Sequence, residues 1–200
     1  PTRLVSVKNE IVAADMYFAC LDGSWDNNGN GTYGEFDDGI NGGDIDWDPE
    51  VYVGRITADN ATEASNHISK IIAYETSANQ PYKALLAGEK MDASPTWSAP
   101  KLNNAYNFMN DMPKTKLYDW SHSSYDWDKS ELINRINSNA YSILLHEGHS
   151  NTQYNMKMNI NDIASLTNSS YLLIYSNGCL PAYFDLASHD SFAEVITNSY

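Results

Sequence analysis

The sequence predicts an α/β fold with a mostly parallel sheet flanked by helices on both faces. Short apolar runs typical of strands alternate along the 200 residues with segments in which apolar residues recur at helical spacing. Two of the runs are continuously apolar, as is usual for strands buried on both faces of a parallel sheet. Residues 22–48 depart from this alternation. We expect them to form a loop insertion within a single domain over residues 1–200.

Six segments are expected to be strands because they are short, apolar and rich in β-branched or aromatic residues. In chain order they are 15–20, 50–56, 83–88, 116–119, 141–146 and 171–175. The last two are the continuously apolar runs. Reactive groups collect at the carboxyl ends of the strands in open parallel sheets. The residues that follow these two runs are therefore the first place to look for chemistry.

Helices are expected between the strands. Asn60 followed by Glu63 is a capping pattern for a helix over 61–77. Asp128 with Glu131 repeats this pattern before another helical segment. The remaining expected helices cover 100–112, 160–167 and 190–198.

Charge and composition exclude several classes of function. The chain carries 12 basic and 26 acidic residues, a net charge of −14. Nucleic acids and anionic membranes are bound by clustered Lys and Arg, so neither partner is expected. No apolar run approaches the roughly 20 residues that span a bilayer. The abrupt ends suggest a piece of a longer polypeptide, and nothing in the sequence indicates an oligomeric state.

The insertion contains a pattern typical of calcium-binding loops, in which oxygen ligands alternate along the chain and a glycine follows. The candidate ligands are Asp26, Asn28, Asn30, the backbone carbonyl of Thr32, and Glu35 or Asp37. Oxygen ligands without His or Cys favour calcium, and we expect its role to be structural. Calcium dependence suits an extracellular or cell-surface setting. The alternative is a solvated turn rich in Asn and Gly.

Two reactive residues follow the two continuously apolar runs. His149 follows the first and Cys179 follows the second, each directly after a glycine. Their separation, 179 − 149 = 30 residues, allows one crossover between adjacent parallel strands. Facing each other, the imidazole and the thiol would suit nucleophilic catalysis, and a helix beginning near Cys179 would favour the thiolate. Backbone amides around Gly148, Ser150 and Gly178 would then stabilise an oxyanion.

Other interpretations of these residues stay open. Most free cysteines are inert buried thiols, and a lone histidine is usually structural. A zinc site is disfavoured. His146 and Glu147 begin the metalloprotease pattern H-E-x-x-H, but its fifth position is Ser150.

Four dispersed motifs, in the right order, resemble the gingipain family of cysteine peptidases, which has a caspase-like fold. The motifs are Pro49–Arg55 (PEVYVGR), the following helical segment ending in Tyr74-Glu75, Gly148-His149, and Cys179 followed by Phe184-Asp185 and Phe192-Ala-Glu194. The resemblance covers about residues 11–198. A calcium-type insertion before the PEVYVGR segment also recurs in members of the family.

The resemblance implies a cysteine endopeptidase that acts on polypeptides. Cys179 would attack the scissile carbonyl, His149 would protonate the leaving amine, and water would hydrolyse the acyl-enzyme. Glu50 matches a family acidic residue thought to support the histidine. The family usually has glycine after this histidine, where this chain has Ser150.

Two classes of function are therefore carried forward. The first is a secreted or surface-exposed cysteine endopeptidase, and a membrane-anchored processing peptidase would share its chemistry. The second is a catalytically inactive, calcium-stabilised caspase-like domain that binds partners or acts as a scaffold.

Overall fold

The computed structural model describes residues 4–7, 10–35, 45, 47–91, 98–119 and 126–199. Contacts divide the chain into an N-terminal unit, residues 1–57, and a C-terminal unit, residues 58–200. The expectation of a single domain stays a prediction. No helix in the described parts of the chain is long and apolar enough to cross a membrane.

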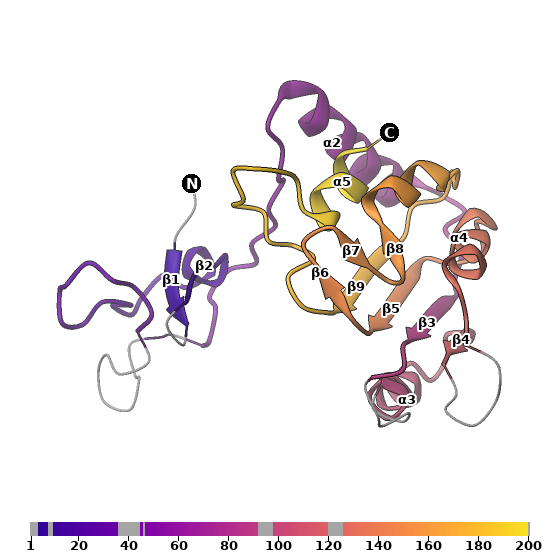
Figure 1. Ribbon diagram of the computed structural model, residues 1–200, viewed down its shortest axis with the longest axis horizontal. Helices are drawn as coiled ribbons and strands as arrows, with labels where there is room; N and C mark the ends of the chain where they lie inside the picture. The colour runs from indigo at the N-terminus through magenta and orange to yellow at the C-terminus, as the bar shows by residue number, and fades with distance from the viewer. Residues whose placement is uncertain are drawn as a thin grey trace. The chain divides into compact units, whose positions relative to one another are not determined.

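A four-stranded parallel sheet forms the centre of the C-terminal unit (Figure 1). In the order β4-β3-β5-β9, its strands are Lys114–Tyr118, Ala84–Gly88, Ile143–Glu147 and Leu173–Asn177. Every neighbouring pair is parallel. The predicted parallel sheet is confirmed, and the four strands expected in this unit are present.

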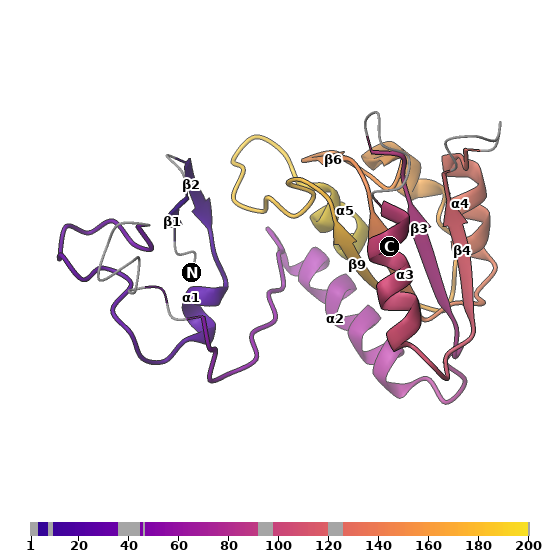
Figure 2. The ribbon, with the colours of Figure 1, turned by 90° about the horizontal axis from the view of Figure 1, so that it is seen from below.

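Helices cover both faces of this sheet, as predicted. Leu85 and Ala87 of β3 pack in a core that includes residues of α4 (Lys129–Asn137) and α5 (Phe192–Asn198). Ala84 and Leu86 pack on the opposite face, where α3 (Ser98–Phe108) lies. This division follows from the alternation of side chains along a strand. Figure 2 shows α3 and α4 on opposite sides of the sheet.

The expected helix caps are present. Asn60 accepts hydrogen bonds from the backbone N–H groups of Thr62 and Glu63 at the start of α2 (Ala61–Thr76). Asp128 accepts one from Glu131 at 2.9 Å before α4. α5 begins with a reciprocal capping box between Ser191 and Glu194.

The expectation that β9 is buried on both faces is wrong. Leu173 and Tyr175 of β9 are 59% and 64% exposed. Leu173 lies opposite Ile143 of β5 and shares its face, where α3 packs on β3, β4 and β5. Among the described residues β9 pairs only with β5. It therefore lies at the edge of the sheet, beyond the helix that covers the other strands.

The connection between β5 and β9 contains a small antiparallel sheet that the sequence analysis missed. Its strands are β6 (Ser150–Asn151), β7 (Tyr154–Asn155) and β8 (Met158–Asn159). Met156 and Lys157 join β7 to β8 with positive φ angles of 55° and 58°, a turn that usually contains Asn or Gly. The helix expected over 160–167 is a 3₁₀ helix, η1 (Ile160–Ser165).

The N-terminal unit contains an antiparallel hairpin of β1 (Leu4–Val7) and β2 (Glu10–Ala13), followed by α1 (Met16–Ala19). α1 replaces the strand expected over 15–20. The ring of Tyr17 makes edge contacts with those of Trp25 and Tyr33. The aromatic pattern therefore reflects a local cluster and not a pleated surface.

The strand expected over 50–56 is also absent. Val51, Tyr52 and Val53 are 39%, 108% and 43% exposed, and the segment has no partner strand among the described residues. A β-rich composition alone does not make a strand without a neighbour to pair with. The described residues of 22–48 contain no helix or strand. That the segment is an insertion stays a prediction.

Candidate active site

His149 and Cys179 follow adjacent parallel strands at matching positions. Glu147 ends β5 and lies opposite Asn177, which ends β9. Each reactive residue comes two positions later, and both are exposed. The predicted placement at the carboxyl edge of two neighbouring strands is therefore observed.

The loops that carry these two residues touch each other. The Ser150 hydroxyl donates a hydrogen bond to the carbonyl oxygen of Cys179 at 2.6 Å. A Cβ atom at Gly178 would lie 2.4 Å from Ser150 Oγ, closer than real contacts allow. Only glycine at position 178 leaves room for this contact. The residue after His149 thus bonds directly to the backbone of Cys179.

A second close approach lies beneath His149. A Cβ atom at Gly148 would lie 2.4 Å from His146 Nε2 and 2.5 Å from Glu89 Cδ. His146 and Glu89 are 1% and 4% exposed. The backbone of Gly148 therefore rests directly on a buried histidine and a buried carboxylate.

These two buried side chains belong to a polar network across the sheet. Glu89 Oε1 lies 3.0 Å from His146 Nε2, and His146 Nδ1 lies 2.8 Å from Ser176 Oγ. The Ser176 hydroxyl donates to Asn155 Oδ1 at 2.9 Å. Glu89 Oε2 also accepts the backbone N–H of His149 at 3.3 Å. The network thus extends to the backbone of the candidate catalytic histidine.

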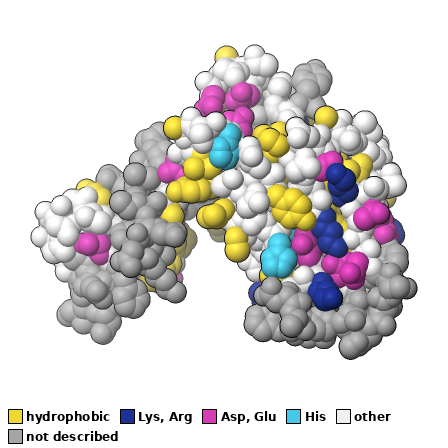
Figure 3. Space-filling view, viewed as in Figure 1, with side chains coloured by type: hydrophobic (Ala, Val, Ile, Leu, Met, Phe, Trp, Pro, Cys, Tyr) yellow, Lys and Arg dark blue, Asp and Glu magenta, His cyan; other side chains and the backbone are white. Residues whose placement is uncertain are grey.

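Charged pairs surround this edge of the sheet. Glu147 binds Lys101 Nζ at 2.5 Å and the Asn177 amide at 2.6 Å. Lys157 Nζ lies 2.7 and 2.8 Å from the carboxylate oxygens of Asp119, the residue after β4. Figure 3 shows acidic, basic and histidine side chains gathered on one face of the C-terminal unit. The carboxyl edge of the sheet is therefore polar, whereas its interior is apolar.

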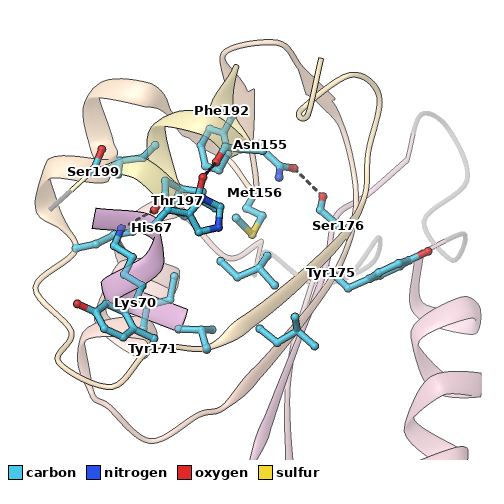
Figure 4. A pocket seen from close by; sticks show the side chains of 18 of the residues that line it. His67, Lys70, Asn155, Met156, Tyr171, Tyr175, Ser176, Phe192, Thr197 and Ser199 are labelled. Carbon is cyan, nitrogen blue, oxygen red and sulfur yellow. Dashed lines mark hydrogen bonds between the residues drawn. The ribbon is translucent and has the colours of Figure 1, made fainter. Parts of the chain in front are cut away.

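A cavity of about 640 Å³ lies between α2, α5, η1 and β9 (Figure 4). Its walls are mainly apolar and include Met156, Ile174 and Phe192, while the Asn155–Ser176 hydrogen bond lies on one side. Lys70 donates to the carbonyl oxygen of Ile196 at 3.0 Å, and burial lowers the pKa of its ammonium group. Pro181 and Ala182, shortly after Cys179, also line the cavity. The cavity therefore lies next to the loop that carries Cys179.

Two details of the site differ from expectation. No helix begins at Cys179: residues 178–190 form turns and irregular structure, and α5 starts at Phe192. The prediction that a helix N-terminus favours the thiolate is therefore wrong. The His149 amide, one of the expected oxyanion donors, instead donates to Glu89. The amides of Gly148, Ser150 and Gly178 remain candidates.

Glu50 lies in the N-terminal unit, where its carboxylate accepts the backbone N–H of Leu21 at 2.7 Å. Its support of His149, which belongs to the C-terminal unit, stays a prediction.

The predicted calcium loop brings several of its oxygen ligands close together. Asp26 accepts the backbone N–H groups of Asn30 and Gly31 at 2.9 and 3.0 Å. Glu35 accepts the side-chain amide of Asn30 at 2.8 Å. Asp37 lies outside the described residues. No group of three or more His, Cys, Asp or Glu side chains suited to a metal occurs in the described part of the chain.

Two residues of the polar network, Glu89 and His146, were not predicted from the sequence. Glu89 directly follows β3, so the rule that singled out His149 and Cys179 could have found it. His146 lies two residues after Leu144 in the apolar run and therefore shares its buried face. That position was the available signal that His146 belongs to the core.

A family model described as peptidase family C25 matches residues 1–199. Neither the curated proteins nor the solved structures contain a significant match to the chain.

Proposed function

Because the chain belongs to peptidase family C25, the gingipain family of cysteine peptidases, we propose that it cleaves polypeptides through a Cys179–His149 dyad. The single observation that carries this proposal is the matched register. Both residues stand two positions beyond paired ends of adjacent parallel strands. The Ser150–Cys179 hydrogen bond supports it, because it joins the two loops directly.

The proposed reaction has two steps. The Cys179 thiolate attacks the scissile carbonyl carbon, and the tetrahedral intermediate collapses as His149 gives a proton to the leaving amine. A water molecule then transfers a proton to His149 and attacks the thioester, releasing the carboxylic acid and regenerating the thiolate. Amides at the two glycine turns are suited to hold the oxyanion. The exposure of Cys179 gives a polypeptide access to it.

A series of thiol-reactive peptidyl probes, varied at the residue before the warhead, tests this proposal. We expect labelling at Cys179 that is abolished in Cys179→Ala and reduced at least about a hundredfold in His149→Ala, as expected for loss of an acid–base group. Cys20→Ala is the matched control, since this buried thiol lies in the other unit. Labelling of Cys20 in place of Cys179 would contradict the proposal.

The second candidate is a binding or scaffold domain that does not cleave. Ser150 favours this candidate, because the gingipain family usually has glycine directly after the catalytic histidine. A folded protein in which no probe labels Cys179, with no hydrolysis of a mixed peptide library, would support it. Hydrolysis that is lost in Cys179→Ala would exclude it.

We also infer that the loop of residues 26–37 holds a structural calcium ion. Its oxygen-rich donors fit a hard cation. The side chains of Asp26, Asn28 and Asn30, a carboxylate from Glu35 or Asp37, and the Thr32 carbonyl would hold the ion. It would supply positive charge that draws these oxygens together. Calcium should raise Tm and chelation reverse the rise, with the effect lost in Asp26→Ala and retained in Asn27→Ala. A Tm insensitive to calcium would contradict the inference.

An extracellular or cell-surface location follows from this inference, since calcium is abundant there. Immunodetection of the protein in secreted, surface and internal fractions of its source cells tests the location. Recovery only in the internal fraction would contradict it.

A further inference from the structure

We propose that Glu89 is a positioning residue that holds His149 for catalysis through the backbone of the histidine. The inference rests on the proposed function, because it concerns the same histidine. Glu89 accepts the His149 N–H with one carboxylate oxygen and faces His146 with the other. Glu89 acts through this hydrogen bond to the His149 backbone, and we propose no contact between Glu89 and the substrate.

Glu89 is held firmly by the sheet. It directly follows β3, and its own N–H donates to the carbonyl oxygen of Glu147 at 2.9 Å. Only 4% of the residue is exposed. A buried carboxylate is costly unless it accepts hydrogen bonds, so its two oxygens strongly favour the N–H groups that face them. The strand beside β5 therefore fixes the start of the loop that follows β5.

His146 locks the carboxylate from its other side. The Ser176 hydroxyl has one proton and donates it to Asn155 Oδ1, so it accepts from His146 Nδ1. On the other side of the ring, His146 Nε2 lies 3.0 Å from Glu89 Oε1. The network thereby links β3, β5, β7 and β9 beneath the candidate dyad.

The packing at Gly148 gives an independent observation. Any Cβ at this position would collide with both Glu89 and His146. The turn therefore sits directly on these two side chains and cannot move toward them. Displacement of a reacting group by about 1 Å can cost about a hundredfold in rate. A support of this kind beneath His149 consequently affects turnover more than substrate binding.

Two substitutions at Glu89 separate positioning from packing. In Glu89→Gln the amide oxygen can still accept the His149 N–H, while the NH₂ group takes the place of the oxygen that faces His146 Nε2. We expect kcat within about fivefold of wild type. Glu89→Met keeps the bulk but removes both acceptors. We expect kcat to fall by about 10- to 100-fold, with KM changed less than about threefold.

The matched control is Leu132→Ala, a fully buried core substitution in α4. It should lower Tm without changing kcat at a temperature where the protein stays folded. Equal kcat losses in Glu89→Met and Leu132→Ala would overturn the proposal, as would a Gln variant as slow as the Met variant.

Hydrogen exchange of the His149 amide provides a readout that does not need activity. Glu89→Met should accelerate this exchange at least about tenfold, the loss expected for one hydrogen bond to a charged group. The Ser169 amide, bonded to Asn139 at 2.8 Å, should be unaffected. If the Met variant does not fold, Ser176→Ala removes the far partner of His146 and should accelerate exchange in the same direction.

The exchange results also separate this inference from the proposed function. An unchanged His149 exchange rate in the folded variant would overturn the positioning role, whatever the activity. Absence of Cys179 labelling in the wild-type protein, with His149 exchange accelerated in Glu89→Met, would overturn the peptidase assignment and leave the structural support intact.

Discussion

At the scale of single residues, close contacts around two glycines determine how the candidate site is built. Gly178 allows Ser150 to reach the carbonyl oxygen of Cys179, and Gly148 allows the His149 turn to rest on buried side chains. Neither glycine adopts a positive φ angle. Each is therefore required for space and not for backbone conformation.

Gly178→Ala should accordingly reduce the rate of Cys179 labelling by at least about tenfold, because the new methyl group would overlap Ser150. Ser150→Gly removes both the hydroxyl and the Cβ that the methyl group would meet. The double variant should therefore recover most of the lost rate. Labelling kinetics of the four proteins test this, and equal losses in the single Gly178→Ala and double variants would contradict it.

Tyr118, the last residue of β4, supports a prediction about pH. Burial, with a smaller effect from Tyr106, raises the pKa of its phenol to about 12. Its hydroxyl has no hydrogen-bond partner among the described residues. The unfolded chain ionises Tyr near pH 10, so the free energy of unfolding should decrease as pH rises from about 10 to about 12.

Tyr118→Phe should make that decrease smaller, and below pH 10 its stability should equal or exceed that of wild type, because a buried unpaired hydroxyl is lost. Urea unfolding at about pH 9 and about pH 11 measures both effects. Tyr82→Phe is the control, because this residue is 63% exposed. A wild-type pH slope in Tyr118→Phe would contradict the assignment.

At the scale of elements, helix starts were predictable because their signals are local. The Asp128 cap of α4 is made within three residues. Asp128→Ala should lower the free energy of unfolding by about 1 kcal/mol, whereas Asp128→Ser should retain most of it. Chemical denaturation measures the difference. An Ala variant as stable as the Ser variant would show that the cap contributes nothing.

Strands were predictable where burial on both faces requires a continuous run of apolar residues. The five residues of β3 are all buried and were recognised from composition. The segments at 15–20 and 50–56 have similar composition but do not form strands, because pairing partners are long-range and leave no local signal. The two-residue strands β6–β8 are too short for alternation to show.

At the scale of the whole molecule, the net charge of −14 should attract cationic substrates and increase the rate at which they associate with the protein. Labelling of Cys179 by a cationic peptidyl probe should slow severalfold as salt rises from about 20 mM to about 300 mM, since screening shortens the range of attraction. A probe with added acidic residues should respond in the opposite direction. Equal salt dependence of the two probes would contradict this.

The positions of His149 and Cys179 at the sheet edge were predictable for a physical reason. Parallel strands present their carboxyl ends together, so a spacing of one crossover places both residues side by side. Glu89 was not found, because its role depends on the N–H of His149 and on His146, which the strand order β3-β5 brings beside it. The order of strands in a sheet cannot be inferred from the local composition of each strand.

His149 and Cys179 each follow their strand end, Glu147 or Asn177, by two residues, and this equal offset limits which insertions and deletions the chain can tolerate. Because Glu147 and Asn177 pair, the positions of His149 and Cys179 are both set by their distance along the chain from the same rung of the sheet. Deleting one residue from either turn would move His149 or Cys179 one position closer to its strand. Its side chain would then point toward the opposite face of the sheet. Heritable variation in loop length should therefore be absent from positions 148 and 178.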